Sequence, residues 1–168
     1  MKFLKKIYLL SIVLLTVTFV NAQDKPASPT AVATGKINGA NITIKYSSPS
    51  VKGRVIWGEL VPFNKVWRAG ANDATTFETD KDLTVEGSKL PAGKYSFFVI
   101  PTEKKCIIIF NKEAKQWGAY KYNEKDDQIR VTVKQQMADS SSESLVYNIK
   151  KNSIVLSWEK WNIPISVK

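Results

Sequence analysis

Apolar and polar residues alternate in short stretches over most of this chain, which is the pattern of strands with one buried face. Near the start, Ile42, Ile44 and Tyr46 alternate with polar neighbours, and Leu83 with Val85 repeats the pattern. The later stretches of the same kind have their apolar positions at Ile129, Val131 and Val133, at Leu145, Tyr147 and Ile149, at Ile154, Leu156 and Trp158, and at Ile163, Ile165 and Val167. The chain therefore predicts many short strands.

Two further stretches are apolar at successive positions rather than at every second one. Residues 95–100 read YSFFVI, and residues 106–110 read CIIIF. A strand with this composition has both faces covered, so these two stretches are expected to be central strands.

Turn-forming residues separate the strand-like stretches, at residues 86–88, 91–93, 123–127, 138–144 and 150–153. Helical periodicity is almost absent, and the single candidate is a short segment at residues 111–117. Many short strands joined by turns indicate an all-β fold, an antiparallel β-sandwich or jelly roll in one domain with at most one short helix.

The first residues have the organisation of a secretory signal peptide. Three lysines precede an apolar run at residues 7–20, and small residues lead to Ala22. The run is shorter than the roughly 20 apolar residues of a membrane anchor. We expect cleavage after Ala22, with residues 23–34 as a flexible lead-in and residues 35–168 as the β-sandwich domain. The mature chain then has no membrane span, and its location is the periplasm of a Gram-negative bacterium or the outside of the cell.

Composition excludes several classes of chemistry. The chain has no histidine, which removes Ser-His and Cys-His nucleophile pairs and the commonest zinc sites. Its eight glycines form no phosphate-binding loop, so we predict neither a cofactor nor a metal. The net charge is +10, but the basic residues are dispersed, and no nucleic-acid partner is expected. The single cysteine, Cys106, is predicted to be buried and unreactive.

The segment from residue 52 to residue 76 carries the first candidate site. It has bulky apolar residues for a loop, and long ordered loops are often functional. We interpret it as a small polar site, in which Arg68 binds an anionic or carbonyl group, Asn72 adds a donor and an acceptor, and Trp67 forms an apolar wall; Arg54 lies in the same region.

A structural interpretation of the same residues stays open. In it, Arg68 pairs with a nearby carboxylate, and Asn72 caps a turn through its own backbone. The carboxylates within reach along the chain are Glu59, Asp73 and Glu78.

Asn111 and Trp117 form a second candidate patch, together with the tyrosines at positions 120 and 122. Aromatic side chains in such a patch could stack on a sugar, or they could simply cover an edge of the sheet.

The sequence resembles the family of small exported bacterial proteins known as domain of unknown function 2911. The resemblance rests on residues 48–54 (SPSVKGR), 66–72 (VWRAGAN), 74–76, 90–95 (LPAGKY), 108–112 (IIFNK) and 117–118. In such proteins a tryptophan often opens the strand that Cys106 opens here, which weakens a catalytic role for the thiol. The resemblance implies export and a β-rich domain, and it implies no reaction.

Taken together, these observations lead to the hypothesis of an exported β-sandwich that binds a small molecule, a glycan or an envelope protein without catalysis. The candidate binding residues are Arg54, Trp67, Arg68, Asn72, Asn111 and Trp117, and no catalytic residue is assigned. Two alternatives stay open: a hydrolase of an envelope polymer that uses carboxylates such as Glu59 or Asp126, and a structural protein of the envelope.

Overall fold

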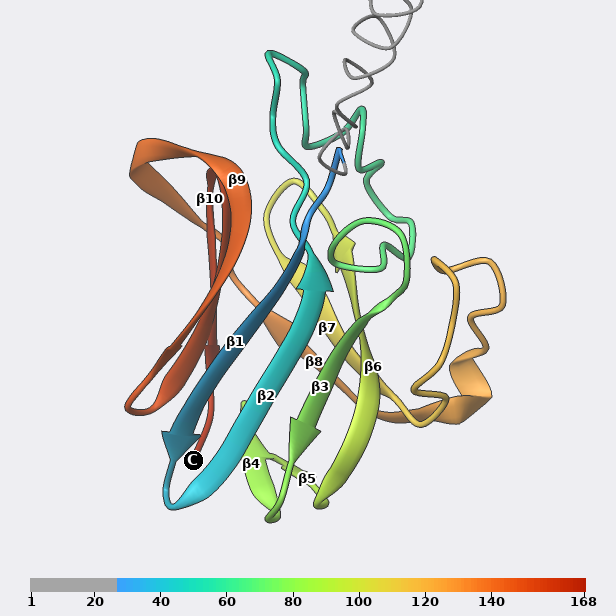
Figure 1. The fold of residues 1–168 in the computed structure, drawn as a ribbon, viewed down its shortest axis with the longest axis vertical. Coiled ribbons are helices and arrows are strands. Elements are labelled where there is room, and N and C mark those ends of the chain that lie inside the picture. Colours follow the sequence, from blue (N-terminus) through green and yellow to red (C-terminus); the bar gives the residue numbers. More distant parts are fainter. Residues whose placement is uncertain (1–26) are drawn as a thin grey trace, which may run out of the picture.

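The computed structural model describes residues 27–168, which form an all-β domain (Figure 1). The strands are β1 (Thr30–Ile37), β2 (Ala40–Ser47), β3 (Thr75–Thr79), β4 (Leu83–Val85), β5 (Ser88–Leu90), β6 (Gly93–Pro101), β7 (Cys106–Asn111), β8 (Asp127–Val133), β9 (Gln136–Lys150) and β10 (Ser153–Ser166). The predicted signal peptide and the start of the lead-in lie outside the described residues. Within residues 27–168, no helix is long and apolar enough to cross a membrane.

Six strands form one antiparallel sheet in the order β1-β2-β3-β6-β7-β8. The register places Ile44 opposite Phe77 and Phe97 opposite Phe110, so apolar side chains from neighbouring strands share one face. This alternation is the one read from the sequence, because successive side chains of a strand point to opposite faces.

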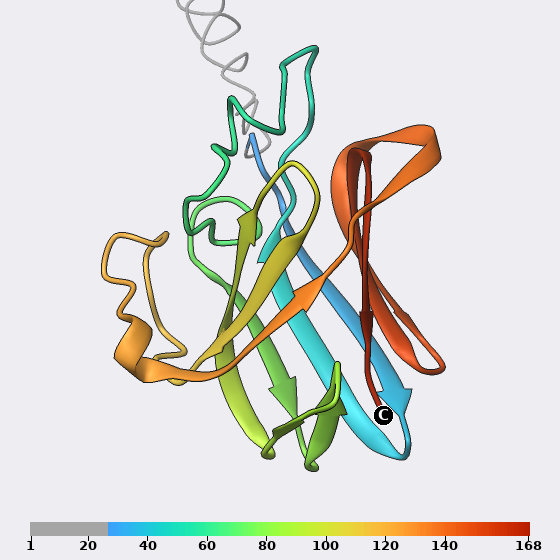
Figure 2. The same ribbon diagram turned by 180° about the vertical axis from the view of Figure 1, so that it is seen from behind.

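The long hairpin of β9 and β10 lies beside β1 in both views (Figures 1 and 2), and its buried side chains share one core with the inner face of the sheet. Leu156 and Ile163 of β10 are fully buried in the same core as the sheet residues. At the β1 edge the two layers approach closely, because a Cβ on Gly35 would lie 2.6 Å from Cγ2 of Ile149. Only glycine fits at position 35, so the glycine there allows β1 to pack this closely against Ile149 of β9.

The outer face of β6 and β7 is also covered. Phe98 and Ile109 are fully buried on it and pack against Ala119 and Tyr122 of the connection between β7 and β8. This connection is the gold loop in Figure 2, which lies over the side of the sheet opposite to the hairpin. The prediction that residues 95–100 and 106–110 form strands with both faces covered is therefore confirmed.

The structure corrects several local expectations. β1 begins at Thr30, so residues 30–34, expected in the flexible lead-in, form part of a strand. The polar segment 138–144, expected as a turn, lies inside β9, where Ser142 pairs with Glu159 of β10. The last two alternating stretches form the single strand β10, which stays continuous across two register shifts beside Glu159.

The short helix expected at residues 111–117 does not form. Asn111 ends β7, and the chain after it is held by side-chain hydrogen bonds such as that from the Glu113 N–H to Oδ1 of Asn111. The only helical turn in residues 27–168 is a 3-10 turn at Glu124–Asp126.

Candidate functional site

The connection between β2 and β3, residues 48–74, lies over one end of the sheet, at the top of Figure 1 in teal and green. Backbone hydrogen bonds fasten its last part to the sheet. The Trp67 N–H donates to the Val99 carbonyl of β6 at 2.8 Å, and the Val99 N–H donates to the Trp67 carbonyl at 2.9 Å. The Thr75 N–H, at the start of β3, donates to the Arg68 carbonyl at 3.1 Å. The backbone of Arg68 is thus held between two strands.

The turn after Arg68 has an unusual backbone. Ala69 has a φ of 53°, in the left-handed region that a residue with a Cβ seldom adopts. Its carbonyl accepts two hydroxyl hydrogen bonds, from Thr75 at 3.0 Å and from Tyr147 of β9 at 2.7 Å. Burial raises the pKa of the Tyr147 hydroxyl well above its usual range, so this donor keeps its proton. The sheet and the hairpin together hold this conformation.

Gly70 brings the turn against β2. A Cβ at this position would lie 2.9 Å from Oγ1 of Thr75 and 3.0 Å from the carbonyl oxygen of Ser47. No larger residue fits without a shift, so glycine lets the turn after Arg68 pack closely against β2.

Four of the six predicted binding residues, Arg54, Trp67, Arg68 and Asn72, line one pocket of about 320 Å³. This volume is at the lower end of the range for small-molecule sites. The other residues that line it are Ser28, Pro49, Leu60, Val61, Gly70, Ala71 and Trp158. No aspartate or glutamate is among the described residues that line the pocket.

Arg68 has no acidic partner among residues 27–168. No carboxylate lies within 4.0 Å of its guanidinium, and Glu78 instead pairs with Lys94 at 3.8 Å. Its Nε is buried and has no hydrogen-bond acceptor in the described part of the chain. The ion pair that the structural interpretation requires is therefore not observed.

Arg54, the second guanidinium of the pocket, is held by its own loop. Its Nε donates to the Val51 carbonyl at 3.0 Å, and its Nη2 donates to the Ser50 carbonyl at 2.5 Å. Two of its nitrogens are therefore used to shape the loop, which leaves Arg68 as the guanidinium with the freer donors.

Asn72 is a turn residue that also lines the pocket. Its φ of 59° is typical of a turn residue, and its Nδ2 donates to Oγ of Ser47 at 3.3 Å, which fastens the turn to β2. It also lines the pocket at the rim, where its side chain is exposed.

Sequence reasoning missed Trp158 of β10 as a pocket residue. Trp158 is 1% exposed, and its ring stacks on that of Trp67 at a centroid distance of 5.7 Å and an interplanar angle of 17°. Its Nε1 is buried without an acceptor, whereas Nε1 of Trp67 donates to the Gly70 carbonyl at 3.2 Å. Alternation along the strand predicts that Trp158 points inward. Nothing in the sequence indicates that it lines the same pocket as Arg68.

Trp57 extends the same aromatic cluster away from the pocket. It stacks on Trp161 at 4.3 Å and contacts Trp158 edge-on at 6.0 Å. Its Nε1 also lacks an acceptor, but Trp57 is not among the residues that line the pocket around Arg68.

Asn111, from the second predicted patch, is fully buried and its side chain is fully used. Its Nδ2 donates to the Asn123 carbonyl at 3.0 Å and to Oδ1 of Asp127 at 2.8 Å. Its Oδ1 accepts from the Glu113 N–H and from Nε2 of Gln116, both at 3.1 Å. The structure places Asn111 as an organiser of the loop after β7, away from the pocket.

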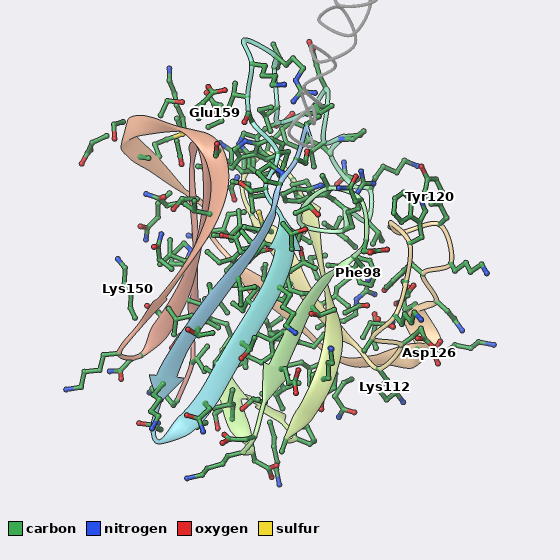
Figure 3. All side chains as sticks on the ribbon, viewed as in Figure 1. Phe98, Lys112, Tyr120, Asp126, Lys150 and Glu159 are labelled. Carbon is green, nitrogen blue, oxygen red and sulfur yellow. The ribbon has the colours of Figure 1, made fainter. Side chains whose placement is uncertain are left out.

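Trp117 lies closer to the pocket but does not line it. Residues 116–118 pair with residues 72–74 through backbone hydrogen bonds, such as that from the Gly118 N–H to the Asn72 carbonyl at 3.2 Å. The Trp117 side chain is 63% exposed, and Tyr120, labelled on the same loop in Figure 3, is 83% exposed. The two predicted patches are therefore neighbours, and the Arg68 side chain reaches the second one, since a Cβ on Gly118 would lie 3.7 Å from Nη1 of Arg68.

The remaining reactive groups do not line the pocket. Cys106 is fully buried, and burial raises the pKa of its thiol to about 12. Asp126 lies on the 3-10 turn of the β7–β8 loop, which Figure 3 labels well away from the β2–β3 connection, and Glu59 is exposed. In residues 27–168, no three Cys, Asp or Glu side chains gather as a metal site would require.

The family described as "Protein of unknown function (DUF2911)" matches residues 28–167, so the chain belongs to that family, as its motifs indicated. No curated protein and no solved structure matches the chain.

Proposed function

We propose that this DUF2911 protein is a non-catalytic binding module whose pocket holds the anionic group of a small ligand on Arg68. The observation that carries the proposal is the buried, unpartnered Nε of Arg68 in a pocket lined by two guanidinium groups and no carboxylate. A buried donor without an acceptor costs about 1 to 3 kcal/mol, and an anion entering the pocket would supply the acceptor.

The surroundings of Arg68 also favour a preformed site. The turn at Ala69 holds a strained conformation through two buried hydroxyl groups, and such strain is concentrated at functional sites. The pocket is therefore organised before a ligand arrives, which lowers the free-energy cost of binding.

The test is a titration of the purified domain with small anions and their neutral analogues, followed by tryptophan fluorescence. Trp67 and Trp158 line the pocket, so occupancy should change the emission. We expect anions to bind and matched amides not to bind. Arg68→Gln should weaken anion binding by about 2 kcal/mol or more, since it removes the charged partner.

The conservative variant Arg68→Lys separates charge from geometry. It should recover part of the affinity, because a lysine keeps the positive charge but lacks the planar fork of the guanidinium. Equal binding of anions and amides by the wild-type domain, or unchanged anion binding by Arg68→Gln, would contradict the proposal.

We propose further that the protein is exported and that the mature chain begins at Gln23. The basis is the charged start, the short apolar run and the small residues before the cleavage position. Intact mass spectrometry of the protein from the periplasm or the medium tests this. A mass that includes residues 1–22 in a soluble fraction would contradict it.

A further inference from the structure

We infer that the protein has a second binding site, which takes an acidic sugar, at the junction of the six-stranded sheet with the β7–β8 loop. The site is a pocket of about 490 Å³. It shares no lining residue with the pocket around Arg68, so it is independent of the proposed function. The residues that define it are Lys45, Asp73, Lys94, Lys115 and Gln116, which line it, and Trp117 beside them.

This second pocket lies on the outer face of the sheet. Lys45 of β2 is paired with Thr76 of β3, and both residues line the pocket. Their chain neighbours Ile44 and Phe77 are buried in the core, so the side chains of Lys45 and Thr76 point to the opposite face. Residues 114–116 of the β7–β8 loop form another part of its wall.

Asp73, which lines the second pocket, stands beside Trp117. The two residues are opposite each other in an isolated antiparallel bridge. The hydrogen bonds of this bridge join the residues on either side of Asp73 to those on either side of Trp117, at 2.9 and 3.2 Å. This arrangement is that of a non-hydrogen-bonded pair, whose side chains lie on the same side with Cβ atoms about 5 Å apart. An exposed carboxylate therefore lies next to an exposed indole ring.

Trp117 is accessible to a ligand, and the backbone beside it is held in place. Its side chain is 63% exposed, so it does not serve to cover an edge of the sheet. The preceding residue, Gln116, is buried, and its Nε2 donates to Oδ1 of Asn111 at 3.1 Å and to the Glu113 carbonyl at 2.8 Å. An exposed ring on a fixed backbone suits the flat C–H face of a sugar, because the contact buries apolar area on both partners.

The second pocket holds charges of both signs that do not pair with one another. Lys45 and Lys115 have no carboxylate within 4.0 Å in residues 27–168, and Asp73 has no cationic partner there. Lys94 pairs with Glu78 at 3.8 Å, and both of these side chains are about half exposed. The lining thus has three ammonium groups against one carboxylate, and this excess favours a negative group on the ligand.

A sugar that carries an anionic group matches all of these features. Its hydroxyl groups can donate to the Asp73 carboxylate, its ring can lie against Trp117, and its anionic group can accept from the lysines. A simple anion is repelled by Asp73 and has no donor for it, and a peptide of acidic residues has neither hydroxyl groups nor a flat C–H face. Lysine is a point charge without the planar fork of arginine, so the site sets no preference among carboxylate, sulfate and phosphate groups.

The experiment measures binding to the purified protein by calorimetry, with trigalacturonate as the acidic sugar. Maltotriose has the rings without the charge, and triglutamate with blocked ends has the charge without the rings. We expect trigalacturonate to bind roughly tenfold or more tightly than either control, since each control lacks one of the two interactions. Glucuronate, glucose 6-sulfate and glucose 6-phosphate should each bind more tightly than glucose, and their order identifies the preferred anionic group.

Two matched pairs of variants locate the site. Trp117→Ala should weaken trigalacturonate binding roughly tenfold. Tyr120→Ala removes a ring of the same loop, labelled in Figure 3, that is 83% exposed but does not face Asp73, so binding should be unchanged. Lys45→Gln should weaken binding about threefold, as expected for an exposed charge pair. Lys36→Gln, on β1 and outside the pocket, should leave it unchanged. Urea unfolding verifies that all four variants fold.

The outcomes separate the second site from the Arg68 pocket. Equal binding of trigalacturonate and either control, or equal effects of Trp117→Ala and Tyr120→Ala, would overturn the acidic-sugar site. Loss of trigalacturonate binding in Arg68→Gln but not in Trp117→Ala would place the sugar in the Arg68 pocket, which overturns the second site and leaves the proposed function standing. If small anions do not bind at Arg68 but trigalacturonate binds in a manner that depends on Trp117, the proposed function fails and the second site stands.

Discussion

The substitution Arg68→Met tests whether the Arg68 guanidinium stabilises the fold or is available to bind a ligand. Methionine retains the length and the apolar stem of arginine but removes the guanidinium. The backbone role of Arg68, whose carbonyl accepts from the Thr75 N–H, is unaffected by the change.

The expected effect on stability follows from what the guanidinium contacts. It has no ion pair and no side-chain hydrogen bond to residues 27–168, so its removal strands no carboxylate. Its buried Nε lacks an acceptor, which is unfavourable by about 1 to 3 kcal/mol, offset in part by the contact of the rest of the group with water. We expect Arg68→Met to leave the free energy of unfolding unchanged or to raise it by about 1 kcal/mol.

The assay is urea unfolding followed by tryptophan fluorescence, with Arg130→Met as the matched control. Nε of Arg130 lies 3.3 Å from Oδ2 of Asp127, whose side chain is 5% exposed, and Arg130 also pairs with Glu124. The control should therefore lose about 1 to 3 kcal/mol. A loss of 3 kcal/mol or more in Arg68→Met would refute the reasoning, since it would reveal a structural partner for Arg68.

Three further changes test other parts of the account. Tyr147→Phe removes the hydroxyl that donates to the Ala69 carbonyl and should lower the free energy of unfolding by about 1 kcal/mol; an unchanged urea midpoint would contradict this. Asn111→Ala removes four buried hydrogen bonds, one of them to Asp127, and should cost roughly 3 kcal/mol; a cost below about 1 kcal/mol would show that the loop does not depend on it. Cys106 should react with a water-soluble thiol reagent at pH 8 only as fast as the protein unfolds, since it is buried and its thiol pKa is raised to about 12; rapid labelling of the native protein would contradict this.

Local pattern was enough to predict the class of fold and its central strands. Runs such as residues 106–110 have apolar residues on both faces, and the structure covers one face with the hairpin and the other with the β7–β8 loop. Residues 138–144 could not be predicted in the same way. All of their side chains except that of Ala138 are polar, and the segment forms a strand because it pairs with β10, as Ser142 does with Glu159. Pairing of this kind depends on the whole fold rather than on the segment.

The candidate site could be predicted only in part, because one of its residues comes from a distant part of the chain. Arg54, Trp67, Arg68 and Asn72 lie in one connection, so proximity in sequence brought them together. Trp158 comes from a strand about ninety residues later, and only the packing of the hairpin against the sheet brings it to the pocket. Asn111 looked similar to Asn72 in sequence, but burial and four hydrogen bonds make it structural.

The most direct test of the central claim is a crystal structure of the domain grown with phenylacetate. The account predicts the anionic group of this ligand in the pocket of about 320 Å³, with an oxygen within hydrogen-bond distance of the Arg68 guanidinium. An empty pocket at a phenylacetate concentration that saturates the fluorescence change, or a carboxylate bound elsewhere on the domain, would contradict it.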